Sequence, residues 1–437
     1  MRKRLSFMVG IVAALLVSAS TWFYMNRILR AQQIADAVAH HRPRGNLSDL
    51  YPRWLGAREL LLHGRNPYSA EITREIQQGY YGRALDPSRA NDPRDDEPKD
   101  QQAFAYPVYV VFLLAPTVGL PFDTVQTAFR WFLVALAAVS VLLWLRLLHW
   151  KASRGTTLIL TALMLGWVPV VQGIKLQQLS LLVAGFLATC GACLAGGWLF
   201  CAGALLALAT IKPQLTWPIV LWLLLWAGSN WSVRRRFIFG FVLSMLLLLA
   251  GAQLLLPGWW RTFLQAVTQY HQYTQNQSVL VWMFGSIAGR TFEVLSVLAC
   301  ALCVWRVRGE SSASVAFGRA FALVLALTVV IVPMFAPYNQ VLLAPAILAL
   351  VQESNGEPIL PAVRWARAVA GILLVWPWIA TLGLTALYLW LTPQLRQRLW
   401  PSPFYSNFML PIFIFGLALL DGWLGERPGL RDGIAAE

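Results

Sequence analysis

Long apolar runs separated by short polar segments make up most of the chain. The runs have about 17 to 25 residues, the length at which a helix crosses a bilayer, and they lack the alternation of barrel strands. Because lipid offers no partners to backbone N–H and C=O groups, we expect the runs to be helical. The sequence therefore predicts an all-α polytopic membrane protein with about 12 transmembrane helices. The predicted spans lie near residues 6–24, 125–148, 157–172, 177–196, 198–211, 213–228, 236–256, 279–306, 316–335, 338–352, 366–391 and 405–424.

Two apolar runs allow a second interpretation. Residues 6–24 follow basic residues, as in a secretory signal, but no A-x-A-like cleavage site closes the run, so we expect a retained helix. Residues 105–122 contain three prolines and are short for a span, and we predict a re-entrant or interfacial segment there. If that segment crosses instead, the orientation of the middle of the chain is inverted.

The charged residues indicate an orientation. Only 13% of residues are charged against 58% hydrophobic, the net charge is +15, and basic residues lie mostly in short loops, as cytoplasmic loops do. There is no basic tract with interleaved aromatic residues, so we expect no nucleic-acid binding. The pattern predicts a multi-pass protein of the cell (inner or plasma) membrane, in contact with membrane lipids. With a cytoplasmic N-terminus, the cytoplasmic loops would carry Lys151 and Arg154, Arg234 to Arg236, Arg306 and Arg308, and Arg364 and Arg367.

The first polar loop, residues 25–104, is long and in this orientation exoplasmic. It contains 11 of the 20 acidic and 12 of the 35 basic residues, so it is near neutral while the rest of the chain is cationic. Its acidic cluster lies in a proline-rich stretch and is expected to be a solvated charge run rather than a metal site. The cluster consists of Asp95, Asp96, Glu97 and Asp100. We therefore predict no metal and no cofactor.

The first half of this loop contains the segment SDLYPRWLGARELLLHGRNPYS, residues 48–69. It predicts a short helix over residues 50–63, with Ser48 or Asp49 as the N-cap and Gly64 as the C-terminal stop. On this pattern alone, Asp49 is a capping residue.

Further motifs follow in order along the chain. The aspartate in DLYPRWLGARELLLHGRNPY precedes an aromatic-Tyr-Pro run, a Gln-rich helix start, a Lys-Pro turn and the triplet NQS. Their sequences are FAYPVYVVFLLAPTVGLPF (104–122), KLQQLSLLVAG (175–185), ALATIKPQ (207–214) and NQS (276–278). This ordered set, from Asp49 to Asn339, resembles glycosyltransferase family 87.

The resemblance implies a GT-C-like bundle that forms one transmembrane domain over residues 1–437. It further implies that a hexose, expected to be mannose, is moved with inversion from a polyprenyl-phosphate-linked sugar donor to a lipid or glycan acceptor on the exoplasmic face. Residues 335–340 read FAPYNQ where the family carries a Ser-Pro and a Trp/His-rich segment, so the sequence does not identify the acceptor.

The implied chemistry needs a base and groups that stabilise a leaving phosphate. The resemblance makes Asp49 the general base, since a carboxylate can accept the acceptor's hydroxyl proton. Lys212 is one of five lysines and precedes Pro213 between two apolar runs, so its ammonium is the candidate for the phosphate. The candidate donor-phosphate or substrate-binding residues are Lys212, Arg53, Arg58, Lys175, Gln177, Gln178, Gln214, Asn276, Gln277, Ser278 and Tyr106.

Other assignments stay open at this point. Glu293, deep in a predicted span, is either a second candidate base or the partner of Arg290 in an ion pair. His271, in a polar loop, is expected to be solvated. A transporter or lipid-linked saccharide flippase is the alternative function, although we find no internal repeat of the kind transporters show. A non-catalytic membrane subunit is a third possibility.

Overall fold

The computed structural model describes residues 2–39, 48–86, 98, 100–274, 277–333, 335–353 and 361–424. Within these ranges all regular elements are helical, which confirms the prediction of a helical membrane protein. The elements are α1 (Arg2–Phe23), η1 (Tyr24–Leu29), α2 (Arg30–Ala39), α3 (Tyr51–His63), α4 (Ala70–Tyr81), α5 (Val110–Leu114), η3 (Ala115–Thr117), α6 (Phe122–Leu147), α7 (Arg154–Leu165), α8 (Val168–Lys175), α9 (Leu179–Ala195), α10 (Leu199–Ala209), η4 (Pro213–Leu215), α11 (Trp217–Gly228), α12 (Trp231–Leu255), α13 (Trp259–Thr274), α14 (Val279–Val307), α15 (Val315–Ile331), η5 (Pro337–Leu343), α16 (Ala344–Glu353), α17 (Pro361–Ala386), α18 (Pro393–Leu399), η6 (Ser402–Asn407) and α19 (Leu410–Leu424).

Fewer helices than expected are long enough to cross a membrane. In the described part of the chain, 6 helical segments are long and apolar enough, and α7 with α8, bent by 56°, makes a seventh if counted as one span. Several apolar runs fold into shorter helices, namely α9, α10, α11 and α15. The 11 residues of α10 rise only ~17 Å, about half of a bilayer's hydrocarbon core. The count of about 12 spans therefore stays a prediction.

Hydrogen bonds hold several helix connections together at one end of the bundle. The guanidinium of Arg234, in the first turn of α12, donates to the carbonyl oxygens of Trp226 and of residues 308–310 at 2.6 to 2.9 Å. The hydroxyl of Ser312 donates to the carbonyl oxygen of Leu194 at 2.8 Å. The α9–α10, α11–α12 and α14–α15 connections thus lie together. We name this region the basic end, because it also carries Arg235, Arg236, Arg306 and Arg308.

The α6–α7 connection reaches the basic end as well. Gly318, in the first turn of α15, packs so closely against α6 that a Cβ atom there would lie 2.7 Å from the carbonyl oxygen of Leu147. The connection that follows Leu147 contains Lys151. The loops with clustered basic residues in the middle of the chain are therefore on one side of the bundle.

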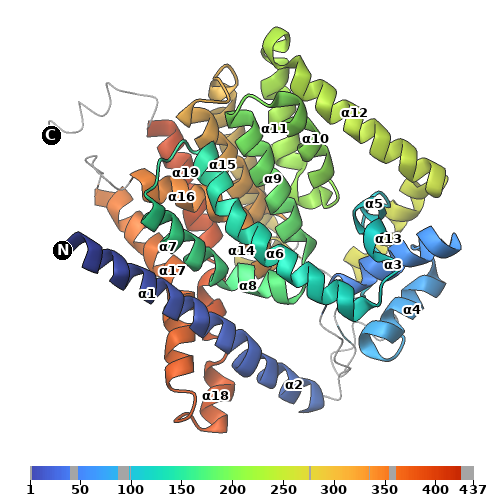
Figure 1. Ribbon diagram of the computed structural model, residues 1–437, viewed down its shortest axis with the longest axis horizontal. Helices are drawn as coiled ribbons and strands as arrows, with labels where there is room; N and C mark the ends of the chain where they lie inside the picture. Colours follow the sequence, from blue (N-terminus) through green and yellow to red (C-terminus); the bar gives the residue numbers. More distant parts are fainter. Residues whose placement is uncertain are drawn as a thin grey trace.

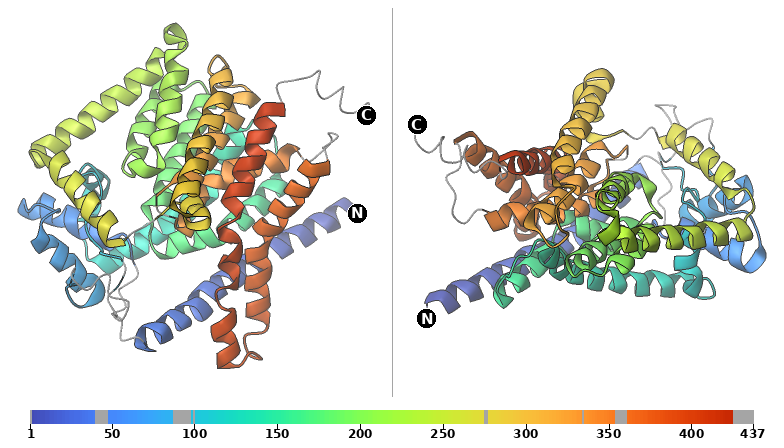
Figure 2. Two further views of the ribbon diagram at one scale, coloured as in Figure 1. Left: turned by 180° about the vertical axis from the view of Figure 1, so that it is seen from behind. Right: turned by 90° about the horizontal axis from the view of Figure 1, so that it is seen from above.

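The helices that leave the basic end lead to a second group of connections, which pack against α3, α4, α5 and α13. We call these four helices the polar corner, and Figures 1 and 2 show them together at one edge of the molecule, with α12 leading to α13. The hydroxyl of Tyr109, which precedes α5, donates to the carbonyl oxygen of Thr210 at 2.9 Å. The polar corner is thereby joined to the α10–α11 connection.

Residues 105–122 contain only short helical turns before α6 begins. The five residues of α5 rise ~8 Å, and Val110, Val111 and Leu114 are buried in the protein. That this segment does not cross the membrane stays a prediction.

The helix predicted over residues 50–63 is present as α3. Gly64 ends it with φ of 65°, in the left-handed region that favours glycine. The expected capping role of Asp49 is wrong, because the N-cap residue is Leu50 and no side chain caps the helix.

Two glycines bring α10 and α12 into backbone contact. A Cβ atom on Gly203 would lie 2.1 Å from the carbonyl oxygen of Phe237, and one on Gly240 would lie 2.1 Å from that of Phe200. Neither position has room for a side chain. The close approach fixes α12, whose other residues are mostly exposed, against the bundle.

Candidate active site

Asp49 lies between α2 and α3, and two contacts direct it toward the α8–α9 connection. Its backbone N–H donates to the carbonyl oxygen of Leu176 at 2.8 Å. Its carboxylate accepts a hydrogen bond from the side-chain amide of Gln178. This explains why the carboxylate does not cap α3: it is engaged by a residue that is distant in sequence.

A chain of hydrogen bonds continues from Gln178 to a buried ammonium. The Oε1 atom of Gln178 accepts from Nζ of Lys212 at 3.3 Å, and Nζ also donates to the hydroxyl of Ser180 at 2.7 Å. Ser180 in turn donates to Oδ1 of Asn339 at 2.8 Å. Lys212 is only 3% exposed, and Nζ lies 5.3 Å from the centroid of the Tyr338 ring. Groups from three helix connections therefore converge on one cation.

Arg53 supplies a second cation from the first turn of α3. Its Nη1 donates to the carbonyl oxygen of Asp49 at 2.9 Å, and its guanidinium lies 4.6 Å from the centroid of the Tyr106 ring. Arg53 is 8% exposed, and its Nε finds no partner within the described residues. Because a buried unpaired donor costs about 1–3 kcal/mol, Nε is a donor that a bound ligand would satisfy.

A second carboxylate, Asp100, lies in the same place and was not expected there. The hydroxyl of Tyr270 on α13 donates to Oδ1 of Asp100 at 3.0 Å, and Gln102 donates to it through its backbone and its side chain. The sequence placed Asp100 in a solvated charge run. Among the acidic residues of this stretch, Asp100 is nearest in sequence to the aromatic-Tyr-Pro run that begins at Phe104. This position could have indicated its place in the site.

These groups line one cavity of about 300 Å³, which we call the charged cavity. Pockets that bind small molecules typically have volumes of about 300 to 1,000 Å³, so the charged cavity is large enough to hold a small ligand group. Of the residues predicted from the sequence, it brings together Asp49, Arg53, Tyr106, Gln178, Lys212 and Gln214. His271, which was expected to be solvated, also lines it.

The surroundings of Asp49 make its carboxylate a stronger base than a solvated one. Burial and the nearby charge of Asp100 raise the pKa of Asp49 to about 6, although Arg53, the hydrogen bond from Gln178 and Lys212 act in the opposite direction. At neutral pH the carboxylate is therefore mostly ionised and still able to take up a proton. Burial also lowers the pKa of the Lys212 ammonium from its usual value.

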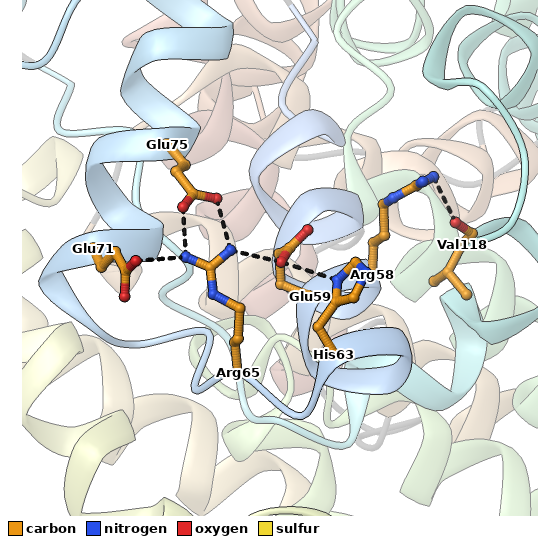
Figure 3. A network of polar contacts seen from close by, with 7 residues as sticks. All are labelled: Arg58, Glu59, His63, Arg65, Glu71, Glu75 and Val118. Carbon is orange, nitrogen blue, oxygen red and sulfur yellow. Dashed lines mark hydrogen bonds and ion pairs between the residues drawn. The ribbon is translucent and has the colours of Figure 1, made fainter.

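Arg58, a predicted phosphate ligand, is not brought to the charged cavity. Its Nη1 donates to the carbonyl oxygen of Val118 at 2.9 Å, and Figure 3 shows it directed away from the neighbouring ion-pair network. That network is centred on Arg65, which pairs with Glu59 at 2.8 Å and Glu71 at 3.0 Å. Arg58 thus joins α3 to the turn after η3, and Arg65 joins α3 to α4.

Lys175 and Gln177 bond to backbone carbonyl groups outside the charged cavity. Nζ of Lys175 donates to the carbonyl oxygen of Met25 at 2.5 Å. The amide of Gln177 donates to the carbonyl oxygens of Ile174 and Lys175 at 2.8 and 2.7 Å, which satisfies groups at the end of α8. Neither residue lines the charged cavity.

The NQS triplet is divided between different surroundings. Ser278 is the N-cap of α14 and accepts from the N–H of Val281 at 3.2 Å. Gln277 lines a separate cavity, described below. Asn276 lies outside the described residues.

The competing base Glu293 lies on α14, and it does not line the charged cavity. No ion pair joins it to Arg290 in the part of the chain that the structure describes, so the ion-pair interpretation of Glu293 is wrong.

Comparison with known protein families gives a match. A family model described as Glycosyltransferase family 87 matches residues 104–337, more than half of the 437 residues. The matched region includes Gln178 and Lys212, whereas Asp49 lies before it. No curated protein and no solved structure gives a significant match.

Proposed function

The chain belongs to glycosyltransferase family 87, and we propose that this membrane glycosyltransferase moves a hexose, mannose, from a polyprenyl-phosphate donor to a lipid or glycan acceptor. One observation carries the proposal: a basic carboxylate, Asp49, faces the same cavity as the buried cations of Lys212 and Arg53. Transfer of a sugar from a phosphate requires these two kinds of group. The proposed reaction assigns no role to a metal ion.

In the proposed reaction the acceptor hydroxyl attacks the anomeric carbon on the side opposite the phosphate. A new carbon–oxygen bond forms, the bond from the anomeric carbon to the phosphate oxygen breaks, and its electron pair stays on the phosphate. The hydroxyl proton passes to the carboxylate of Asp49. A single displacement of this kind inverts the configuration at the sugar carbon.

Lys212 and Arg53 are suited to the negative charge that the leaving phosphate develops. Both are held in place before the reaction, Lys212 by Gln178 and Ser180, so they need little reorganisation as charge builds up. The unpaired Nε of Arg53 offers a further donor for a phosphate oxygen.

Helix α13 supports a donor with a lipid tail. It contributes Phe263 and Tyr270 to the lining of the charged cavity, while Trp260 and Leu264 on the same helix are 51% and 55% exposed. An amphipathic helix with exposed aromatic and aliphatic side chains is typical of the membrane interface. A polyprenyl chain could remain in the lipid while its phosphate reaches the cavity.

The distribution of charge supports an exoplasmic site. The basic end and the charged cavity lie at opposite ends of α9, α10, α11 and α15, and clustered Lys and Arg favour the cytoplasmic side. We therefore propose that the charged cavity opens to the exoplasmic face of the cell membrane.

The test is transfer from a radiolabelled polyprenyl-phosphate mannose in membranes that contain Asp49→Asn. We expect transfer to fall by about 10² to 10⁴, the usual contribution of a general base, while the amount of protein in the membrane is unchanged. Glu293→Gln, the matched control, should transfer normally. Normal transfer by Asp49→Asn would remove Asp49 as the base.

Two further measurements test the flippase alternative and the proposed orientation in the membrane. A flippase would move the labelled lipid across proteoliposome membranes equally well with either variant, without a glycosylated product. Labelling of Asp49→Cys from the cytoplasmic side only would overturn the proposed orientation.

A further inference from the structure

A second cavity, of about 460 Å³, lies on the other side of the chain that leads into η5. Pro333 and Tyr338 line the charged cavity, whereas Phe335 and Pro337, between them in sequence, line the second one. The N–H of Phe335 donates to the carbonyl oxygen of Gln277 at 3.2 Å and holds this chain in place. The two cavities are neighbours that share one wall.

The second cavity differs from the first in charge. None of the described residues that line it is charged. Its polar groups are the side-chain amides of Gln33, Gln172, Gln277 and Asn407 and the indole N–H groups of Trp282 and Trp400. An anionic ligand such as a phosphate would find no counter-ion there. The chemistry favours an uncharged ligand with several hydrogen-bonding groups.

Two of the amides each have one buried atom that lacks a partner within the described residues. Oε1 of Gln172, on α8, is an unpaired acceptor, and Nδ2 of Asn407, at the end of η6, is an unpaired donor. Asn407 is only 2% exposed, and its backbone carbonyl already accepts from Gln340 at 2.8 Å. Because buried polar groups are normally paired, the two atoms indicate a ligand that both donates and accepts. Hydroxyl groups do so.

Aromatic rings form another part of the lining. Trp282 and Phe408 stack with ring centroids 4.1 Å apart and an interplanar angle of 17°, and Phe335 lies 4.9 Å from Phe408. Trp282 is 59% exposed, so its indole is accessible. A pyranose ring has a flat C–H face that packs on an aromatic ring and hydroxyl groups at its edge that pair with amides.

We propose that the second cavity binds a neutral saccharide, the glycan part of the acceptor. A prenyl or acyl chain would leave the amides of Gln172 and Asn407 unpaired, and a saccharide satisfies both. The assignment of this saccharide as the acceptor rests on the proposed function. The binding of a neutral saccharide rests only on the residues that line the cavity.

The test measures saccharide binding directly. Saturation-transfer NMR on the full-length protein in nanodiscs would use mannotriose and maltotriose as neutral probes and trigalacturonic acid as the charged one. We expect saturation of a neutral trisaccharide and none of the acid. Gln172→Met and Trp282→Ala should each weaken binding about tenfold, the effect of losing roughly one hydrogen bond or ring contact.

Matched controls keep the two proposals separable. Trp305→Ala removes a similarly exposed tryptophan, 54% against 59%, from the opposite end of α14 and should bind as the unaltered protein does. Asp49→Asn should lose transfer and keep saccharide binding. Saccharide signals that are absent in the unaltered protein, or unchanged in both cavity variants, would overturn the second site. Normal transfer by Asp49→Asn together with lost binding in the cavity variants would overturn only the proposed base.

Discussion

The side-chain amide of Gln178 donates a hydrogen bond to the carboxylate of Asp49, 129 positions away in the sequence. The other end of the same amide accepts from the ammonium of Lys212. Only one orientation of the amide suits both charges, with nitrogen toward the anion and oxygen toward the cation. The proposed base and the proposed phosphate ligand are therefore positioned by one residue.

Replacing Gln178 by leucine should move the pH dependence of transfer. The hydrogen bond from Gln178 lowers the pKa of Asp49, so its loss should shift the acidic limb of the kcat/KM profile upward by roughly one unit. Activity should fall at neutral pH and recover in part at higher pH. The measurement is the pH profile of transfer in purified Gln178→Leu. A uniform loss at all pH values would indicate a merely structural role.

Asp100→Asn should have the opposite effect. The charge of Asp100 raises the pKa of Asp49, so its removal should move the acidic limb, expected near pH 6, to lower pH. Asparagine can still accept the hydrogen bond from Tyr270 through its side-chain oxygen, which preserves the packing. The same pH profile serves as the measurement, and an upward shift contradicts the assignment.

Lys212→Met should reduce kcat strongly, by about 10² to 10³, the usual cost of losing one donor to a developing anion. Lys175→Met is the matched control, because its ammonium contacts Met25 and lies outside the charged cavity. Transfer at saturating donor measures both. Equal losses in the two variants would mean that charge in this region acts on folding rather than on the phosphate.

Gly203→Ala should destabilise the protein without touching the charged cavity. Its methyl group would have to displace the backbone at Phe237, and overpacking of this kind costs about 1–3 kcal/mol. Gly371→Ala, on α17, has open space at the added atom and should be neutral or slightly stabilising. Thermal unfolding followed by tryptophan fluorescence compares the two. A lower midpoint for Gly371→Ala than for Gly203→Ala would contradict the packing of α10 on α12.

The sequence predicted the local features of the fold better than the long-range ones. The helix that ends at Gly64 and the membership of family 87 are confirmed, since both depend on short motifs. The number of spans was harder to predict, because composition does not reveal where an apolar run breaks. Residues 157–172 formed one run in the sequence, and the chain bends there by 56° between α7 and α8.

For the charged cavity, residue type indicated the chemistry but not the direction of each side chain. Lys212 follows α10 and Lys175 ends α8, and only Lys212 lines the cavity. Asp100 was missed because its acidic neighbours in sequence suggested solvation. Such differences depend on the rotation of helices and on contacts between distant segments, which a single sequence does not display.

The hydrogen bonds from Arg234 to the carbonyl oxygens of residues 308–310 limit how the helices can move relative to one another. They tie the start of α12 to the end of α14, and such charged hydrogen bonds are among the stronger ones in proteins. For the proposed lipid-linked donor, this favours entry at the far end, where α13 lies. The basic end would act as a fixed pivot during each turnover.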